Sequence, residues 1–215
     1  MSLKTYVHSP KSGKKPESMV ILLHGLGANG QDLLGLAQFW QRLLPDTVFL
    51  SPDAPFPCDM APVGFQWFSL QDWSPASILE GVQTAAPILD AYIDEMLEKY
   101  GLSDDKLALV GFSQGTMMSL YAGPRRKKKI AGVLGYSGAL IGAETLGESA
   151  VHKIPVHLVH GDFDMVVPIT AYYMALESLE SHGFTVSGGV TAGLGHGIDD
   201  EGIESGGEFL SKVLS

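Results

Sequence analysis

The chain has 215 residues, of which 45% are hydrophobic and 18% charged, a composition typical of a globular protein and not of a disordered or collagen-like one. Its formal net charge of −10 argues against a nucleic-acid partner. The one cysteine, Cys58, excludes an intrachain disulfide and fits a reducing compartment. Because the sequence also shows neither a signal-peptide core nor an apolar run long enough for a transmembrane segment, we expect a cytoplasmic protein.

Short apolar runs alternate with helical patterns along the chain. In chain order we expect a strand at 19–23, a helix at 31–44, a strand at 47–50, a helix from Ser74-Pro75 to 100, a strand at 107–110, a helix after Gly115 that stops at Pro124, strands at 130–134 and 156–159, a helix at 169–179, a weaker strand at 184–190 and a last helix from about 199 to 214. This alternation predicts an α/β fold, with a mostly parallel sheet and helices on both faces. No linker or repeat interrupts it, so residues 1–215 are expected to form one domain.

Two stretches stand out from this pattern. Residues 52–74 have no clear periodicity, and loops of that length usually carry a function. This loop is rich in large apolar side chains, namely Phe56, Met60, Phe65, Trp67, Phe68, Leu70 and Trp73. The basic run at 125–129 follows a predicted helix, and we interpret it as a solvated helix end or loop.

Residues 107–115 read Leu-Ala-Leu-Val-Gly-Phe-Ser-Gln-Gly, so an apolar strand runs directly into a Gly-x-Ser-x-Gly turn. A serine on such a sharp strand-to-helix turn has its hydroxyl pushed out of the sheet and its backbone forced towards positive φ. The turn crowds the residues two before and two after the serine, where Gly111 and Gly115 carry no Cβ atom to clash. Ser113 is therefore the candidate nucleophile.

A serine nucleophile needs a general base, and the base needs an orienting acid. Hydrolases with this turn supply them in the order serine, acid, histidine. Of the seven histidines, only His182 and His196 follow late enough in the chain. His182 ends a predicted helix, whose C-terminus explains it, so His196 is the candidate base. The acid is expected in the loop after 156–159, where the residues alone leave Asp162 and Asp164 open.

The negative charge that develops on a tetrahedral intermediate needs backbone N–H donors. One is expected from Gln114, directly after the nucleophile, and the other from the loop His24-Gly-Leu-Gly27 after the first buried strand. Leu26 is the expected second donor. We interpret His24 itself as a residue that braces this loop and not as a base.

A metal site is the alternative for the cluster around the expected acid, since His157, His160 and the two aspartates are all possible ligands. The odd spacing of His157 and His160 along a strand points their side chains to opposite faces of the sheet. We therefore expect neither a metal nor another cofactor.

Four motifs, in this order, resemble the phospholipase/carboxylesterase family of α/β-hydrolases, which includes the acyl-protein thioesterases. The motifs are His24-Gly-Leu-Gly27, Gly111-Phe-Ser-Gln-Gly115, His160-Gly-Asp-Phe-Asp164 and Gly193-Leu-Gly-His196. The resemblance implies that Ser113 is the nucleophile, Asp164 the acid and His196 the base. It also implies that the amides of Leu26 and Gln114 form the oxyanion hole.

The loop at 52–74 resembles the substrate side of the same family, which implies that Trp67, Phe68 and Leu70 line an acyl pocket. Ordinary core packing is the alternative for these side chains. Two positions depart from the family pattern: Met165 stands where proline often follows the acid, and Ala28-Asn29 where eukaryotic thioesterases tend to have Asp-Thr. The resemblance therefore does not extend to acyl-protein specificity.

These observations together predict a serine carboxylesterase that hydrolyses small carboxylic esters, with thioesters or lysophospholipids as further acyl donors. A chain of 215 residues has no space for a large cap domain, so we expect an open site. The alternatives are a non-catalytic ligand-binding protein on the same fold, an acyl-protein thioesterase, and a peptidase, for which no peptide-terminus clamp is evident. Exposed aromatic side chains leave a homodimer open.

Overall fold

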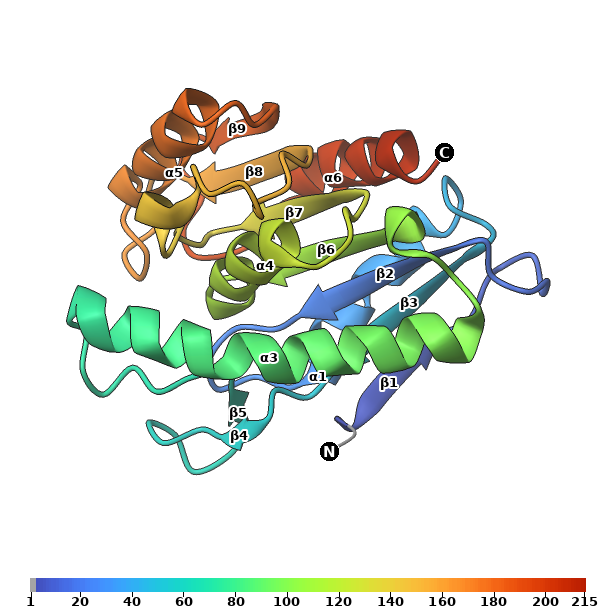
Figure 1. Cartoon of the computed structure of the whole chain (residues 1–215), viewed down its shortest axis with the longest axis horizontal. Coiled ribbons are helices and arrows are strands. Elements are labelled where there is room, and N and C mark those ends of the chain that lie inside the picture. Colours follow the sequence, from blue (N-terminus) through green and yellow to red (C-terminus); the bar gives the residue numbers. More distant parts are fainter. Residues whose placement is uncertain (1–2) are drawn as a thin grey trace.

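One seven-stranded sheet, in the order β1-β3-β2-β6-β7-β8-β9, organises the computed structural model, which describes residues 3–215 (Figure 1). Its strands are β1 (Thr5–His8), β2 (Ser18–Leu23), β3 (Thr47–Pro52), β6 (Leu107–Phe112), β7 (Gly132–Tyr136), β8 (Val156–Gly161) and β9 (Val186–Thr191). Only the β1–β3 pair is antiparallel, and every other neighbouring pair is parallel. The predicted α/β fold with a mostly parallel sheet is therefore confirmed.

Helices cover both faces of this sheet. They are α1 (Gly30–Leu34), α2 (Leu36–Trp40), α3 (Pro75–Tyr100), α4 (Gln114–Arg125), α5 (Thr170–Ser181) and α6 (Asp200–Val213), with short 3₁₀ turns at Asp104–Lys106 and Ala143–Thr145. Helices α3, α4 and α5 pack on one face, whereas α1, α2 and α6 pack on the other (Figure 1). No helix within residues 3–215 is both long and apolar enough to cross a membrane.

The central strands are apolar throughout because both of their faces are covered. In β2, Met19 and Ile21 join the cluster beneath α3 and α4, while Val20 and Leu22 join the cluster beneath α2 and α6. All six residues of β2 are buried, whereas the edge strand β9 is mostly exposed or half-buried. The apolar runs in the sequence therefore mark the interior strands, and the weaker pattern marks an edge.

The structure differs from the sequence prediction in its shortest elements. The single helix expected at 31–44 is split into α1 and α2 at Gly35, the residue of lowest helix propensity between them. Strand β1 was not predicted, and the loop at 52–74 contains a small hairpin of β4 (Phe56–Pro57) and β5 (Phe65–Gln66). Helix α4 includes Pro124 and ends one residue after it.

The interpretation of the basic run at 125–129 as solvated is wrong for its first two residues. Arg126 is buried and forms ion pairs with Asp90 (3.0 Å), Asp94 (2.6 Å) and Asp104 (2.8 Å). Arg125 is half-buried and donates a hydrogen bond to the carbonyl of Gly142 (2.7 Å). The two arginines hold α4 to neighbouring segments, and only the lysines at 127–129 are exposed.

We expect Arg126→Met to lower the free energy of unfolding by about 3 kcal/mol, because removing the buried arginine leaves the enclosed carboxylate of Asp104 without its ion-pair partner. The side chain of Asp104 is only 12% exposed, so water replaces little of what Arg126 supplies. Urea unfolding followed by circular dichroism measures the change. Lys128→Met, in the exposed part of the same basic run, should leave stability nearly unchanged; equal losses in the two variants would contradict a structural role for Arg126.

Candidate active site

Ser113 lies on the sharp turn between β6 and α4, as the sequence predicts. Its backbone has φ 55° and ψ −117°, a conformation that a non-glycine residue adopts only where its surroundings enforce it. Its amide donates to the carbonyl of Tyr136 in the neighbouring strand β7 (2.9 Å). A Cβ atom on Gly111 would lie 2.4 Å from the backbone of Gly115, and one on Gly115 would lie 1.8 Å from the carbonyl oxygen of Leu23. Both glycines are therefore required by the turn.

Asp164 lies in the loop after β8, with its carboxylate fully enclosed. Oδ1 accepts hydrogen bonds from the amides of Val166 (2.9 Å) and Val167 (2.8 Å), and Oδ2 accepts one from Nδ1 of His196 (2.7 Å). Burial by itself would raise the pKa of Asp164, but the hydrogen bonds from His196 and the two amides outweigh burial and lower the pKa below its ordinary value. The carboxylate is thus held ionised and pointed at the imidazole.

Asp162, the other acid that the sequence left open, contacts a different part of the same region. Its Oδ1 accepts a hydrogen bond from the amide of Gly193 (2.6 Å), three residues before His196. Asp162 therefore holds the loop that carries His196, whereas Asp164 bonds the imidazole itself.

His196 lies in the loop after β9 and packs beside the turn that carries Ser113. Its ring centroid is 4.9 Å from that of Phe112, the residue before the serine, and the next carbonyl, Gly197, accepts a hydrogen bond from Ser137 Oγ (3.3 Å). Because Nδ1 donates to an ionised carboxylate, a neutral imidazole carries its lone pair on Nε2, where a general base needs it. His182, the other downstream candidate, bonds the Ser178 carbonyl at the end of α5 (2.7 Å), as expected for a residue at a helix C-terminus.

The loop after β2 brings the predicted oxyanion donors beside Ser113. A Cβ atom on Gly25 would lie only 3.3 Å from the Cβ of Ser113, so the loop and the turn are in contact. Within residues 3–215, the amides of Leu26 and Gln114 make no hydrogen bond, which leaves both free for an oxyanion. His24 is completely buried, and burial lowers its pKa. It braces the loop, as expected, through hydrogen bonds to the amide of Ala54 and the carbonyl of Gly25.

Three predicted substrate-lining residues are buried. Trp67 has no exposed surface, Leu70 is only 4% exposed, and neither lines a groove beside the site; we correct their role to packing and support. Phe68 is also buried but lines a groove of about 430 Å³ between the β4–β5 hairpin and the start of α3. Its predicted contact with substrate stays a prediction.

The large apolar side chains that are exposed near the site come from other positions. Phe163, Met165 and Val166, which flank the acid, are all more than half exposed. On the loop at 52–74, Met60, Val63 and Trp73 are exposed as well. The sequence did not indicate the exposure of the first group, because apolar residues that follow a strand are buried in one fold and exposed in another.

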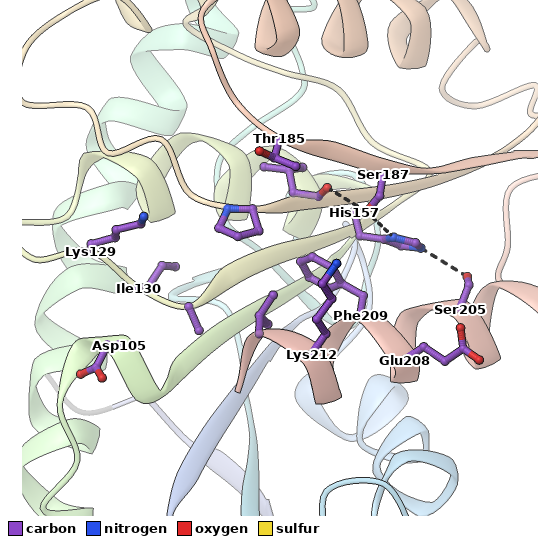
Figure 2. A pocket seen from close by; sticks show the side chains of 14 residues that line it. Asp105, Lys129, Ile130, His157, Thr185, Ser187, Ser205, Glu208, Phe209 and Lys212 are labelled. Atoms are coloured by element: carbon purple, nitrogen blue, oxygen red, sulfur yellow. Dashed lines mark hydrogen bonds between the residues drawn. The ribbon is translucent and has the colours of Figure 1, made fainter. Parts of the chain in front are cut away.

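A pocket of about 750 Å³ lies at the amino ends of β7, β8 and β9, and no residue of the Ser113, Asp164 and His196 set lines it (Figure 2). Within it, His157 bonds Ser187 (2.9 Å) and Ser205 (3.3 Å), and burial lowers the pKa of the imidazole. The pocket lies opposite the carboxyl ends of the parallel strands, where Ser113 lies. Its size therefore does not mark it as the catalytic site.

The two histidines on β8 do not lie on the same face of the sheet, as a shared metal site would require. His157 stacks on Phe209 of α6 (5.2 Å), whereas His160 packs beside Tyr172 of α5 (6.2 Å), so the two face opposite sides of the sheet, as their spacing predicted. In the described part of the chain, no group of three histidine, cysteine, aspartate or glutamate side chains could hold a metal ion.

Similar proteins of known sequence are esterases and thioesterases. The chain is 28% identical to acyl-protein thioesterase 1 of Gibberella zeae over 212 residues, which covers 91% of this chain and 90% of that protein. It is also 28% identical to esterase YpfH of Escherichia coli over 198 residues, with 92% and 83% covered.

Solved structures agree with the sequence relatives. The crystal structure of esterase PE8 matches with a TM-score of 0.94 and 37% identity over the full length of both chains. SOBER1 of Arabidopsis thaliana matches with a TM-score of 0.75 and 26% identity, over 92% of this chain and 99% of that one. The phospholipase/carboxylesterase family model matches residues 5–214, which include the serine turn, the buried acid and the histidine that we find at the carboxyl ends of the parallel strands. The chain belongs to the phospholipase/carboxylesterase family.

Proposed function

We propose that the chain is a serine esterase in which Ser113, His196 and Asp164 form the catalytic triad. The observation that carries the proposal is the 2.7 Å hydrogen bond from His196 Nδ1 to the enclosed Asp164 carboxylate, next to the strained turn of Ser113. A base oriented by an ionised acid and a serine exposed by a strand-to-helix turn are the parts that acyl transfer needs.

The first half of the reaction transfers the acyl group to the enzyme. Nε2 of His196 takes the hydroxyl proton of Ser113 as Oγ bonds the substrate carbonyl carbon, and the carbonyl oxygen becomes an oxyanion. The amides of Leu26 and Gln114 donate hydrogen bonds to that oxygen. The intermediate then expels the alcohol or thiol, which takes the proton from His196, and the acyl group stays on Ser113.

Hydrolysis completes the cycle. His196 removes a proton from water as the water oxygen bonds the acyl carbon, and the second tetrahedral intermediate breaks its bond to Ser113. The proton returns to Oγ and the carboxylic acid leaves. Asp164 stays ionised throughout and stabilises the imidazolium that forms in both halves.

Carboxylic esters with short or flexible acyl chains are the proposed substrates. The exposed apolar side chains of Phe163, Met165 and Val166 lie beside the acid, so an acyl chain can contact them without a closed tunnel. Phe68, in the groove beside α3, is a further proposed contact. Several relatives are acyl-protein thioesterases, and a thioester is attacked by the same steps, with a thiol as leaving group.

A fluorophosphonate probe tests the proposal directly, because it forms a covalent bond only with an activated serine. We expect stoichiometric labelling of the folded protein, with the modified peptide containing Ser113, and no labelling after heat denaturation. Hydrolysis of matched p-nitrophenyl esters and acyl thioesters of increasing chain length then ranks the substrates. A folded protein that neither reacts with the probe nor hydrolyses any ester would instead support the non-catalytic binding protein.

We further propose a single domain and a cytoplasmic location. The sheet takes strands from Thr5 to Thr191 without an intervening second core, which supports one domain. One free thiol, Cys58, fits a reducing compartment.

A further inference from the structure

The two proposed oxyanion donors belong to separate segments, Leu26 to the loop after β2 and Gln114 to the start of α4. Both must point at one oxygen atom for the site to work. We propose that the side chains of Gln114, Trp67 and His24 form a buried hydrogen-bonded chain that fixes the Leu26 amide relative to the Gln114 amide. They are positioning residues for the reaction proposed above, on which this inference rests.

The first link joins Gln114 to the loop at 52–74. Its side chain is almost fully buried, and Oε1 accepts a hydrogen bond from the main-chain amide of Trp67 (2.9 Å). Its Nε2 donates to the carbonyl of Phe68 (2.7 Å). Because the side-chain amide bonds the main-chain N–H of residue 67 and the main-chain carbonyl of residue 68 at once, these two residues are held in one register against the start of α4.

The second link joins Trp67 to the loop after β2. The indole has no exposed surface, and Nε1, its only polar atom, donates to the carbonyl of His24 (3.0 Å). The His24 carbonyl lies two residues before Leu26. Trp67 thus bonds Gln114 through its main chain and the loop after β2 through its side chain.

The third link is His24, which orients the Leu26 peptide. Nε2 accepts a hydrogen bond from the amide of Ala54 (2.9 Å), so the proton of the neutral ring is on Nδ1, and Nδ1 donates to the carbonyl of Gly25 (2.7 Å). Burial lowers the pKa of His24, which keeps this neutral form. The Gly25 carbonyl and the Leu26 N–H belong to one planar trans peptide and point in opposite directions. Fixing the carbonyl therefore aims the N–H.

These contacts predict an effect on the transition state that core packing alone would not produce. An amide that is misaimed still allows an ester to bind, but it bonds the oxyanion less well. Loss of the chain should therefore lower kcat and leave KM nearly unchanged. It should also weaken binding of a trifluoromethyl ketone, which forms a tetrahedral oxyanion adduct with the serine.

Trp67→Phe removes the indole N–H and keeps an aromatic ring in the core. We expect kcat for p-nitrophenyl butyrate to fall about 10-fold or more, with KM unchanged and with trifluoromethyl ketone affinity reduced by a similar factor. Trp40→Phe is the matched control. Trp40 is equally buried, and its Nε1 also donates to a main-chain carbonyl, that of Ile203 (2.8 Å), but on the α6 face of the sheet. The Trp40→Phe control should keep the wild-type kcat even if its melting temperature falls as far as that of Trp67→Phe.

Gln114→Met is the second test, because it keeps the backbone amide but loses both side-chain hydrogen bonds. It should give the same fall in kcat. If Trp67→Phe does not fold, the kcat of Gln114→Met tests the positioning role by itself. Equal kcat in Trp67→Phe and Trp40→Phe, or a change in KM alone, would overturn the positioning role. Failure of the esterase proposal is distinguishable, because the wild-type protein would then be inactive and unlabelled by fluorophosphonate.

Discussion

Replacing Ser113 with alanine should lower kcat for p-nitrophenyl butyrate by about 10³-fold or more. In the proposed mechanism the hydroxyl supplies the atom that bonds the acyl carbon, and no acyl-enzyme can form without it. What activity is left would come from water activated by His196 beside an intact oxyanion hole. Initial rates over a range of substrate concentrations measure the change, and fluorophosphonate labelling should disappear in the same variant.

Ser119→Ala is the control for this substitution. Ser119 is also buried, and its hydroxyl donates to the carbonyl of Gly115 within α4 (2.8 Å), so the variant loses a serine hydroxyl and a hydrogen bond close to the same turn. Its kcat should stay within a few-fold of the wild-type value. If Ser113→Ala kept most of the activity, the nucleophile would have to be another residue and the proposed mechanism would fail.

Asp164→Asn should lower kcat about 10³-fold, whereas Asp162→Asn should lower it less than about 10-fold. An asparagine at 164 presents an NH₂ group or a neutral oxygen to His196, which removes the charge that stabilises the imidazolium and permits the wrong tautomer. At 162, the asparagine carbonyl still accepts the hydrogen bond from Gly193. Steady-state kinetics of both variants on one ester, with melting temperatures to confirm folding, make the comparison.

The pair of variants is its own control, because each substitution exchanges one carboxylate for an amide of the same shape. The reverse ranking would move the acid to Asp162 and would require the loop at 193–196 to adopt a different conformation. Equal losses with equally lowered melting temperatures would show that the loop, and not the charge, limits the rate.

The sheet could be predicted from the sequence because its interior strands are apolar on both faces. The runs at 19–23 and 107–110 are apolar at every position, which is typical of parallel strands whose two faces are both covered by helices. Strands β1 and β4 could not be predicted, since four- and two-residue segments show no periodicity and form only where a distant partner meets them. Most helix ends were displaced by one or two residues, and the helix expected to reach residue 44 ends at Trp40, because capping and packing as well as local sequence determine where a helix stops.

Within the candidate site, residue order indicated one serine and one histidine as candidates, but it could not choose between two aspartates in one loop. That choice depends on where Gly193 and His196 return to the sheet, which is a property of the folded chain. The expectation that Trp67 lines an acyl pocket was wrong, because a sequence does not distinguish an aromatic side chain that faces a substrate from one that is buried in the core. Trp67 is completely buried.

The error over the basic run has a physical cause too. Five consecutive basic residues are typical of a solvated surface, and the partners of Arg126 are far along the chain. Asp90 and Asp94 lie one helical turn apart on α3 and present two carboxylates to the end of α4. Their spacing is the signal in the sequence that could have indicated a buried arginine.

The way in which the loop at 52–74 is attached has a consequence for how such enzymes diversify. Residues 65–68 are bonded to the loop after β2 and to α4, whereas Met60, Val63 and Trp73 lie on either side of them and are exposed. We therefore expect the outer parts of the loop to tolerate exchange, by evolution or by engineering, without displacing the proposed oxyanion donors. In this proposal, the range of esters accepted and the rate of the chemical step can change independently of one another.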